Sequence, residues 1–278
     1  MYCFSDKWNN NRDITRPMGI RGQFKAMSNP TSKLAQVTAW FWIIKITATT
    51  LGETFSDYLA HPEGLALGYA TTALIVIGLF FVTLFLQLRA NKHSAVLFWL
   101  VILSTSVAGT SISDFIDRTL KMGYPAGSAM LASLLLIIFW LWKHQGGQLH
   151  VASIQTRRDE TFYWMAILIS NTLGTALGDF LADSSGLGFA GGAEVIGVLL
   201  LVTVLLYAFT SLSRVLLFWV AFILTRPFGA TLGDTLTKPL NAGGLGLGTA
   251  ASSMVLLVIL VFSILVSNRK QTTETFPG

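Results

Sequence analysis

The amino-acid sequence predicts an all-α, polytopic membrane protein whose eight transmembrane helices form four parallel two-helix repeats. Three observations support this prediction: the composition, the length of the apolar runs and a pattern that recurs four times. Hydrophobic residues make up 53% of the 278 residues and charged residues only 12%, which leaves too little polar surface to coat a soluble globule. Roughly 20 apolar residues cross a hydrocarbon core about 30 Å thick as a helix. Runs of suitable length lie at 37–58, 66–88, 95–116, 125–142, 162–181, 191–212, 215–236 and 248–266.

The runs divide the chain into a membrane domain and two tails. Residues 1–36 contain six basic residues but no apolar core followed by a small-residue cleavage site. They are expected to form a disordered basic cytoplasmic tail rather than a signal peptide. Residues 269–278 are expected to form a C-terminal tail. The membrane domain covers 37–268, with repeats at about 37–92, 93–150, 158–212 and 213–268.

Basic residues flank the apolar runs unevenly, and this bias predicts the orientation of the chain. Cytoplasmic loops of membrane proteins retain Lys and Arg. Fourteen basic residues fall on the side of the N-terminal tail, whereas the opposite side has three, Arg118, Lys121 and Lys238. Both termini are therefore expected to be cytoplasmic. The expected partner is the lipid bilayer, and the same bias accounts for the pI of about 9.4 without a nucleic-acid partner.

One pattern recurs in the first helix of every copy. It begins with an aromatic pair that ends in tryptophan, and a glycine and an aspartate follow ten and fifteen residues after the tryptophan. The tryptophans are Trp42, Trp99, Trp164 and Trp219; the glycines are Gly52, Gly109, Gly174 and Gly229; the aspartates are Asp57, Asp114, Asp179 and Asp234. Each copy contains an even number of crossings, so all four copies enter and leave on the same side, and their symmetry axis is expected along the membrane normal.

With this repeat count, helix count and tryptophan, residues 37–268 resemble a family of bacterial membrane proteins that carry four tandem copies of domain of unknown function 347. The resemblance implies a multi-pass protein of the bacterial inner membrane. It implies no activity, so function has to be inferred from the residues.

The spacing between tryptophan and aspartate places the two at different depths in the bilayer. Fifteen residues of helix span roughly 22 Å. The four tryptophans are expected to anchor the helices at the cytoplasmic interface, which puts the aspartates toward the outer end. An ionised Asp at the bilayer centre costs roughly 2.5 to 3.5 kcal/mol, and less near the interface. The aspartates are therefore expected to face the bundle interior or a watery cavity.

Three further carboxylates lie within one turn of a repeat aspartate, at near-neighbour spacings on a helix: Glu53, Asp117 and Asp183. Converging carboxylates suit oxygen-based metal coordination and proton exchange. The expected cation- or proton-binding residues are Asp57, Asp114, Asp179, Asp234, Glu53, Asp117 and Asp183. The expected metal ligands are Asp57, Asp114, Asp179 and Glu53. In the alternative interpretation, the aspartates are structural and hydrogen-bond loops or neighbouring helices.

Two basic residues, Lys45 and Arg226, lie within the predicted spans and are candidate internal counter-charges. Arg226 lies near mid-membrane, where a guanidinium needs a carboxylate partner, either Asp234 or an acid of another copy. Lys45 has a second interpretation, in which its side chain extends to the cytoplasmic headgroups. The positions that match Arg226 in the other copies are also polar, which predicts a hydrophilic level below the aspartates: Thr49, Ser106 and Asn171.

The carboxylate layer favours an integral membrane transporter of an inorganic cation, with a divalent metal ion expected and proton coupling as a variant. Oxygen ligands favour hard or borderline ions over copper. The alternative is a non-transporting assembly or sensor subunit whose Asp and Arg residues lock the helices together. No enzyme and no cofactor are expected, because the four histidines lie in loops or at helix ends, no phosphate-binding loop is present and the single cysteine, Cys3, excludes a thiolate site.

Overall fold

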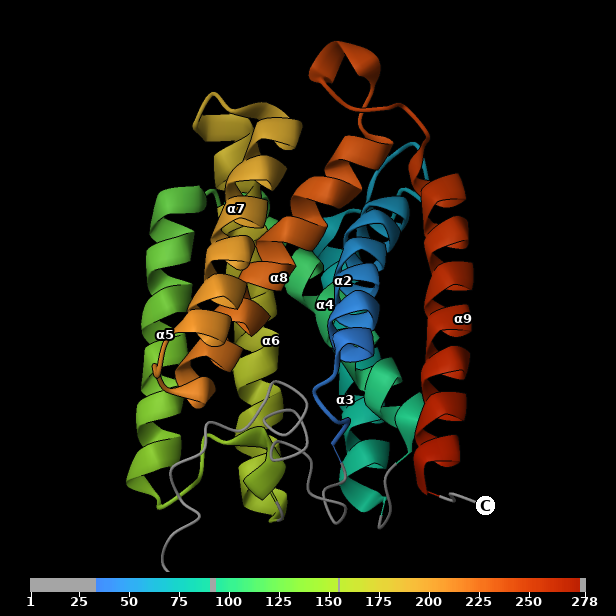
Figure 1. Ribbon diagram of the computed structural model, residues 1–278. Helices are drawn as coiled ribbons and strands as arrows, with labels where there is room; N and C mark the ends of the chain where they lie inside the picture. The colour runs from blue at the N-terminus through green and yellow to red at the C-terminus, as the bar shows by residue number, and fades with distance from the viewer. Residues whose placement is uncertain (1–33, 91–93, 155, 276–278) are drawn as a thin grey trace, which may run out of the picture.

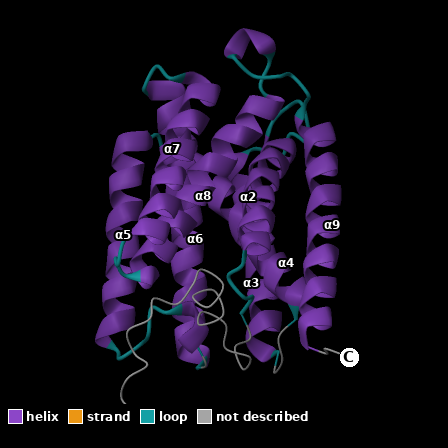
Figure 2. Ribbon diagram, in the orientation of Figure 1, coloured by secondary structure: helices purple, strands orange, loops and turns teal. Residues whose placement is uncertain are grey.

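The computed structural model describes residues 34–90, 94–154 and 156–275, which form a bundle of eight α-helices (Figure 1, Figure 2). The helices are α2 (Ala39–Ala60), α3 (Tyr69–Arg89), α4 (Ala95–Asp114), α5 (Tyr124–His144), α6 (Arg157–Asp179), α7 (Gly188–Phe209), α8 (Arg214–Thr237) and α9 (Thr249–Thr275). Five-residue π-helical turns, Phe115–Thr119 and Phe180–Ser184, follow α4 and α6. Most of the expected basic tail, with Cys3, lies outside the described residues.

The helices match the predicted runs within a few residues, with two exceptions. Helix α6 begins at Arg157, ahead of the predicted 162, and the backbone of α9 continues to Thr275, so much of the expected C-terminal tail is helical. Within the described residues, seven helices are long and apolar enough to cross a membrane. The remaining one is α2, whose 22 residues include Lys45, Glu53 and Asp57. Length and composition therefore support seven crossings, one fewer than predicted.

The first helix of every copy begins at a hydroxyl-bearing N-cap. In each case the side-chain oxygen accepts a hydrogen bond from the backbone N–H three residues later, which satisfies one of the free N–H groups at a helix start. The four caps lie between four and eight residues before the repeat tryptophan of their copy: Thr38, Ser94, Thr156 and Ser213. For α6, this cap explains the early start.

Helices α2, α4, α6 and α8, the first helices of the four copies, form a closed inner ring. Helix α2 packs against α4, α4 against α6, α6 against α8, and α8 back against α2. The second helix of each copy packs mainly on the first helix of the next copy: α3 on α4, α5 on α6, α7 on α8 and α9 on α2. Figure 1 shows α5 and α9 at opposite edges of the bundle. The interior is therefore built between copies rather than within them.

The four inner helices run in the same direction. Aromatic residues near their starts contact one another around the ring, with ring centroids 6.4 Å apart for Phe41–Phe98, 5.5 Å for Phe98–Trp164, 6.1 Å for Tyr163–Trp219 and 6.4 Å for Phe218–Phe41. The aspartates near the helix ends share basic partners, as described below. The beginning of α2 and the end of α9 consequently lie at the same end of the bundle (Figure 1).

Glycines allow the inner helices to approach closely. A Cβ placed on the repeat glycine of one copy would lie 2.3–2.9 Å from a side-chain atom of the next copy, at the residue three positions before that copy's own glycine. These contacts close the ring: Gly52 meets Ser106, Gly109 meets Asn171, Gly174 meets Arg226 and Gly229 meets Thr49. The predicted hydrophilic level is thus also the level at which the helices touch.

One backbone form recurs where the second helix of each copy begins. Three consecutive residues there have positive φ at the first and third positions, and the third is always glycine, the residue that adopts this conformation at least cost. The segments are Ala66–Gly68, Lys121–Gly123, Gly186–Gly188 and Gly246–Gly248. The middle residue is a large apolar side chain, exposed in every copy: Leu67, Met122, Leu187 and Leu247.

Gly174 provides a direct test of the helix contacts, because a Cβ there would lie 2.5 Å from both Cβ and Cγ of Arg226. Gly174→Leu is expected to lower the free energy of unfolding by about 1–3 kcal/mol or more, the usual cost of overpacking. Thermal unfolding in detergent measures the change. Gly78→Leu is the matched control, since it lies on α3 with nothing within 4 Å of the added Cβ. Equal melting temperatures for the two variants would contradict the close contact.

Candidate functional site

The four repeat aspartates lie buried at one end of the inner ring. Asp57, Asp114, Asp179 and Asp234 are each 4% exposed. Four residues stand one turn further along the chain, each four positions after its aspartate, with 24–40% of the side chain exposed. We call these four residues the rim: His61, Arg118, Asp183 and Lys238. The aspartate layer is thus shielded from solvent by a titratable or permanently charged group of every copy.

Two basic rim residues join neighbouring copies. Lys238 Nζ lies 2.9 Å from Asp57 Oδ2 and 3.3 Å from Asp234 Oδ1, which links copies four and one. Arg118 Nε lies 2.9 Å from Asp114 Oδ1, and its Nη2 lies 3.5 Å from Asp179 Oδ2, which links copies two and three. The four aspartates are therefore held in two pairs, each around one basic side chain of the rim.

Lys238 lies just beyond α8, outside the apolar span. Burial by itself lowers the pKa of its ammonium, but the carboxylates of Asp234 and Asp57 outweigh this effect and hold that pKa above its usual value. Lys238 is therefore charged throughout the neutral pH range, and its pairing with both aspartates persists there.

A buried ion pair lies one turn deeper. Arg226 is fully buried, and its Nη2 lies 3.0 Å from Glu53 Oε2. The guanidinium also donates to the Thr110 hydroxyl and to the carbonyl oxygens of Thr49 and Ser106, and Thr110 donates to Glu53 Oε2 at 3.1 Å. The expectation that Arg226 has a buried carboxylate partner is confirmed. That partner is Glu53 of copy one, because α8 packs directly against α2.

Three buried carboxylates converge above this pair. Oxygen atoms of Glu53, Asp179 and Asp234 all lie within 4.8 Å of one another. Such spacing suits a hard cation held by oxygen ligands at about 2.3–2.6 Å. Gly233 makes room for the cluster, because a Cβ at this position would lie 2.9 Å from Glu53 Cβ. The three ligands come from copies one, three and four.

This arrangement changes the expected set of metal ligands. Glu53 and Asp179 come together as expected, but their third partner is Asp234, which sequence analysis had assigned no place among the metal ligands. Asp57 and Asp114 are instead each within 2.9 Å of a basic side chain. Each basic rim residue lies closer to the aspartate outside the cluster, at 2.9 Å, than to the one inside it, at 3.3 Å for Asp234 and 3.5 Å for Asp179.

The two remaining predicted acids lie away from the trio. Asp117 Oδ2 accepts a hydrogen bond from Ser113, and its Oδ1 sits in the space that the missing side chain of Gly127 on α5 leaves open. Asp183 belongs to the rim, where its Oδ2 accepts from the Tyr124 hydroxyl at 3.0 Å and lies 3.9 Å from Arg118. Neither is within the described carboxylate cluster.

Lys45 is an interior residue. Its side chain is fully buried, its Nζ donates to Asn171 Oδ1 at 3.2 Å, and it lies 4.2 Å from the centre of the Phe222 ring. The interpretation in which Lys45 extends to the headgroups is therefore wrong. Helices α6 and α8 cover this face of α2, so the amine points into the bundle. That Lys45 is a counter-charge stays a prediction, because its Nζ contacts an amide oxygen rather than a carboxylate.

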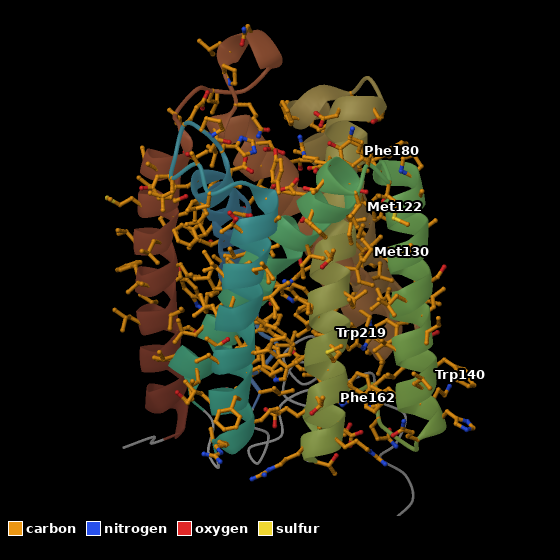
Figure 3. The ribbon with its side chains drawn as sticks, turned by 180° about the vertical axis from the view of Figure 1, so that it is seen from behind. Met122, Met130, Trp140, Phe162, Phe180 and Trp219 are labelled. Atoms are coloured by element: carbon orange, nitrogen blue, oxygen red, sulfur yellow. The ribbon has the colours of Figure 1, made fainter. Side chains whose placement is uncertain are left out.

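Three of the tryptophans expected at the membrane interface lie inside the bundle. Trp99, Trp164 and Trp219 are at most 5% exposed, whereas Trp42 is half-buried. Figure 3 shows the contrast between Trp219, among the helices, and Trp140, which projects outward from α5. Aromatic packing between copies takes the place of the expected headgroup contact. With the residues before them they form an aromatic layer at the end opposite the aspartates: Phe41, Phe98, Tyr163 and Phe218, all at most 5% exposed.

The sequence places Lys238 one turn beyond Asp234, but Arg118 was assigned to orientation alone. The spacing of Arg118, four residues after Asp114, is a signal that would have placed it beside the carboxylates. The roles of Thr110 and Asn171 have no comparable signal. Both depend on which helix of another copy lies opposite them.

The Arg226–Glu53 pair predicts a coupled effect on stability. Removing one partner of a buried ion pair typically costs about 3–5 kcal/mol, because the other charge is left uncompensated. Arg226→Leu is expected to show a loss of this size in detergent unfolding, and the double variant with Glu53→Leu is expected to recover part of it. A double variant no more stable than Arg226→Leu would show that the two side chains are not coupled.

Comparison with known proteins agrees with the repeat. The family described as Repeat of Unknown Function (DUF347) matches residues 40–93, 97–148, 162–213 and 217–273. No curated protein and no solved structure matches the chain. Each of the four matched segments covers most of one inner helix and of the outer helix that follows it. On this coverage, the chain belongs to the DUF347 repeat family and carries four tandem copies of the repeat.

Proposed function

We propose that this protein is a transporter of divalent cations in which Glu53, Asp179 and Asp234 bind the ion. The observation that carries the proposal is the convergence of three buried carboxylates from three different copies. Placing like charges together in an apolar bundle is costly, and a hard divalent ion would offset that cost. Carboxylate oxygens favour ions such as Mg²⁺, Ca²⁺ and Mn²⁺.

The distribution of polar and apolar layers supports a route that is open toward the rim and closed at the other end. The rim is partly exposed and lies directly over the aspartates. The aromatic layer closes the axis at the opposite end. In this arrangement the cation enters and leaves the site past Arg118 and Lys238, and passage across the bundle requires the aromatic layer to separate.

We place all eight helices across the bacterial inner membrane as parallel repeats, with both termini cytoplasmic and the rim outside. Helix α2 need not be as apolar as the others, because α4, α8 and α9 surround it. The outer helices carry the lipid-facing side chains, among them Leu74, Leu136, Val204 and Val258, each at least 59% exposed. The excess of Lys and Arg on the opposite side from the rim supports this orientation.

The second candidate is a non-transporting assembly or sensor subunit. The observation that favours it is the pairing of Asp57, Asp114 and Glu53 with basic side chains of the protein itself. In that case the charged network only locks the copies together, and charge-removing substitutions would change stability alone.

The orientation can be tested with single cysteines at exposed loop positions on the rim side. Glu63→Cys, Ser185→Cys and Asn241→Cys, each in a background without Cys3, are expected to react with an impermeant thiol reagent added to intact cells. All three side chains are exposed. Labelling only after lysis would invert the proposed orientation.

The binding site can be tested by removing charge without changing shape. Glu53→Gln and Asp179→Asn are each expected to lower Mn²⁺ uptake into proteoliposomes at least about tenfold, the smallest loss typical of removing a group that supports a metal site. Uptake is read from quenching of an entrapped dye. Glu194→Gln, an exposed acid on α7, is the matched control. Full uptake by the Glu53→Gln, Asp179→Asn double variant would rule out this site.

A further inference from the structure

Lys45 is the interior charge that the proposed binding site does not use. Its side chain is fully buried, and its described polar contact is the 3.2 Å hydrogen bond from Nζ to Asn171 Oδ1. The Asn171 amide is oriented for this role, because its Nδ2 donates to Thr105 Oγ1 at 3.0 Å. The Phe222 ring, 4.2 Å away, provides the other favourable contact for an ammonium.

No carboxylate lies within salt-bridge distance of Lys45 among the described residues. Helix α6 presents the neutral Asn171 to it and α8 presents Phe222, together with Arg226, whose charge has the same sign. Helix α4 contributes the hydroxyl of Thr105, which reaches Lys45 only through its hydrogen bond with Asn171. Residues 249–268 of α9 contain no ionisable side chain. A buried amine that lacks a counter-ion can exist in either protonation state, since no ion pair holds its proton.

The position of Lys45 in the repeat is informative. It lies twelve residues before Asp57, and the equivalent residues of the other copies are apolar and fully buried: Ile102, Ile167 and Phe222. Lys45 therefore places a titratable amine between the carboxylate cluster and the aromatic layer. The other three copies have an apolar side chain at this level. An apolar side chain is enough to fill this position in the other three copies. Packing therefore does not explain why Lys45 carries an amine.

The ion pairs of the other basic groups provide an explanation. Arg118, Arg226 and Lys238 each have a nitrogen within 3.0 Å of a carboxylate oxygen. A divalent cation bound to Glu53, Asp179 and Asp234 would add positive charge to the bundle interior, and loss of one proton from a basic group would offset part of that charge. Because ion pairs hold the protons of the other three groups, Lys45 is the proton donor.

We propose that Lys45 is the proton-carrying residue of a cation–proton exchange, an inference that rests on the function proposed above. When a divalent cation binds to Glu53, Asp179 and Asp234, the Lys45 ammonium releases one proton to water and becomes a neutral amine. When the cation leaves, the amine takes up one proton. The cation and the proton thus alternate in the bundle.

The separation is short enough for this coupling. Eight residues of helix place Lys45 roughly 12 Å below Glu53. At an effective dielectric constant of about 20, two unit charges at this distance interact by about 1.4 kcal/mol, which is about tenfold in affinity. Because coupling between two binding equilibria is reciprocal, the protonated lysine weakens cation binding by at least this factor.

The test is proton release during Mn²⁺ binding to the full chain in lipid nanodiscs. Bound Mn²⁺ is measured by loss of the free-ion paramagnetic signal, and protons by a pH dye in weak buffer. Lys45→Met and Lys45→Arg are both expected to release about one proton fewer per Mn²⁺ than the wild type. Lys45→Arg keeps the charge and the length of the side chain, so it is expected to bind Mn²⁺ at least about tenfold more weakly than Lys45→Met.

Ile102→Met is the matched control, since it changes the equivalent position of copy two and is expected to keep the wild-type ratio. An unchanged proton count in both Lys45 variants would overturn the role of Lys45 while leaving the cation site in place. Wild-type protein that does not bind Mn²⁺ saturably, or binding that survives Asp179→Asn unchanged, would instead overturn the proposed function. Proton release therefore separates the two failures.

Discussion

A glycine stands at each contact between neighbouring inner helices, and the rest of the structure depends on the close approach that it permits. Each glycine receives the side chain or backbone of the residue three positions before the next copy's own glycine. Were these helices held a side chain further apart, Arg226 would not reach Glu53, and Lys45 would not reach Asn171. Dispersion and hydrogen bonding, rather than the hydrophobic effect, must hold such helices together in lipid, so short contact distances decide the stability of the bundle.

The packing of each outer helix on the next copy makes the four copies mutually dependent. A single copy would leave its inner helix, with buried polar groups such as Glu53, exposed to lipid. The ring closes when α9 packs on α2 and α8 packs on α2, so the last copy completes the environment of the first. This explains how α2 can contain three charged residues although the other seven helices are apolar enough to span a membrane alone.

Departures from the repeat supply the chemistry. The repeat glycines and the aspartates recur at the same positions in every copy, and the loop residues of positive φ recur where its second helix begins. The charged interior residues do not: Glu53 has the counterparts Thr110, Thr175 and Ala230, and Arg226 has Thr49, Ser106 and Asn171. Single substitutions break the symmetry and create one cluster from three copies.

The sequence by itself determined the fold class, the helix positions, the repeat and the level of the aspartates, because hydrophobic run length and residue spacing are properties of the chain along its own axis. It also determined that Arg226 needs a carboxylate. Only the tertiary structure decided that this carboxylate is Glu53, that Asp234 rather than Asp57 completes the cluster, and that Lys45 and three tryptophans point inward. These outcomes depend on which copies are neighbours and on how the ring closes, and contacts between residues more than 100 positions apart leave no periodic signal in one sequence.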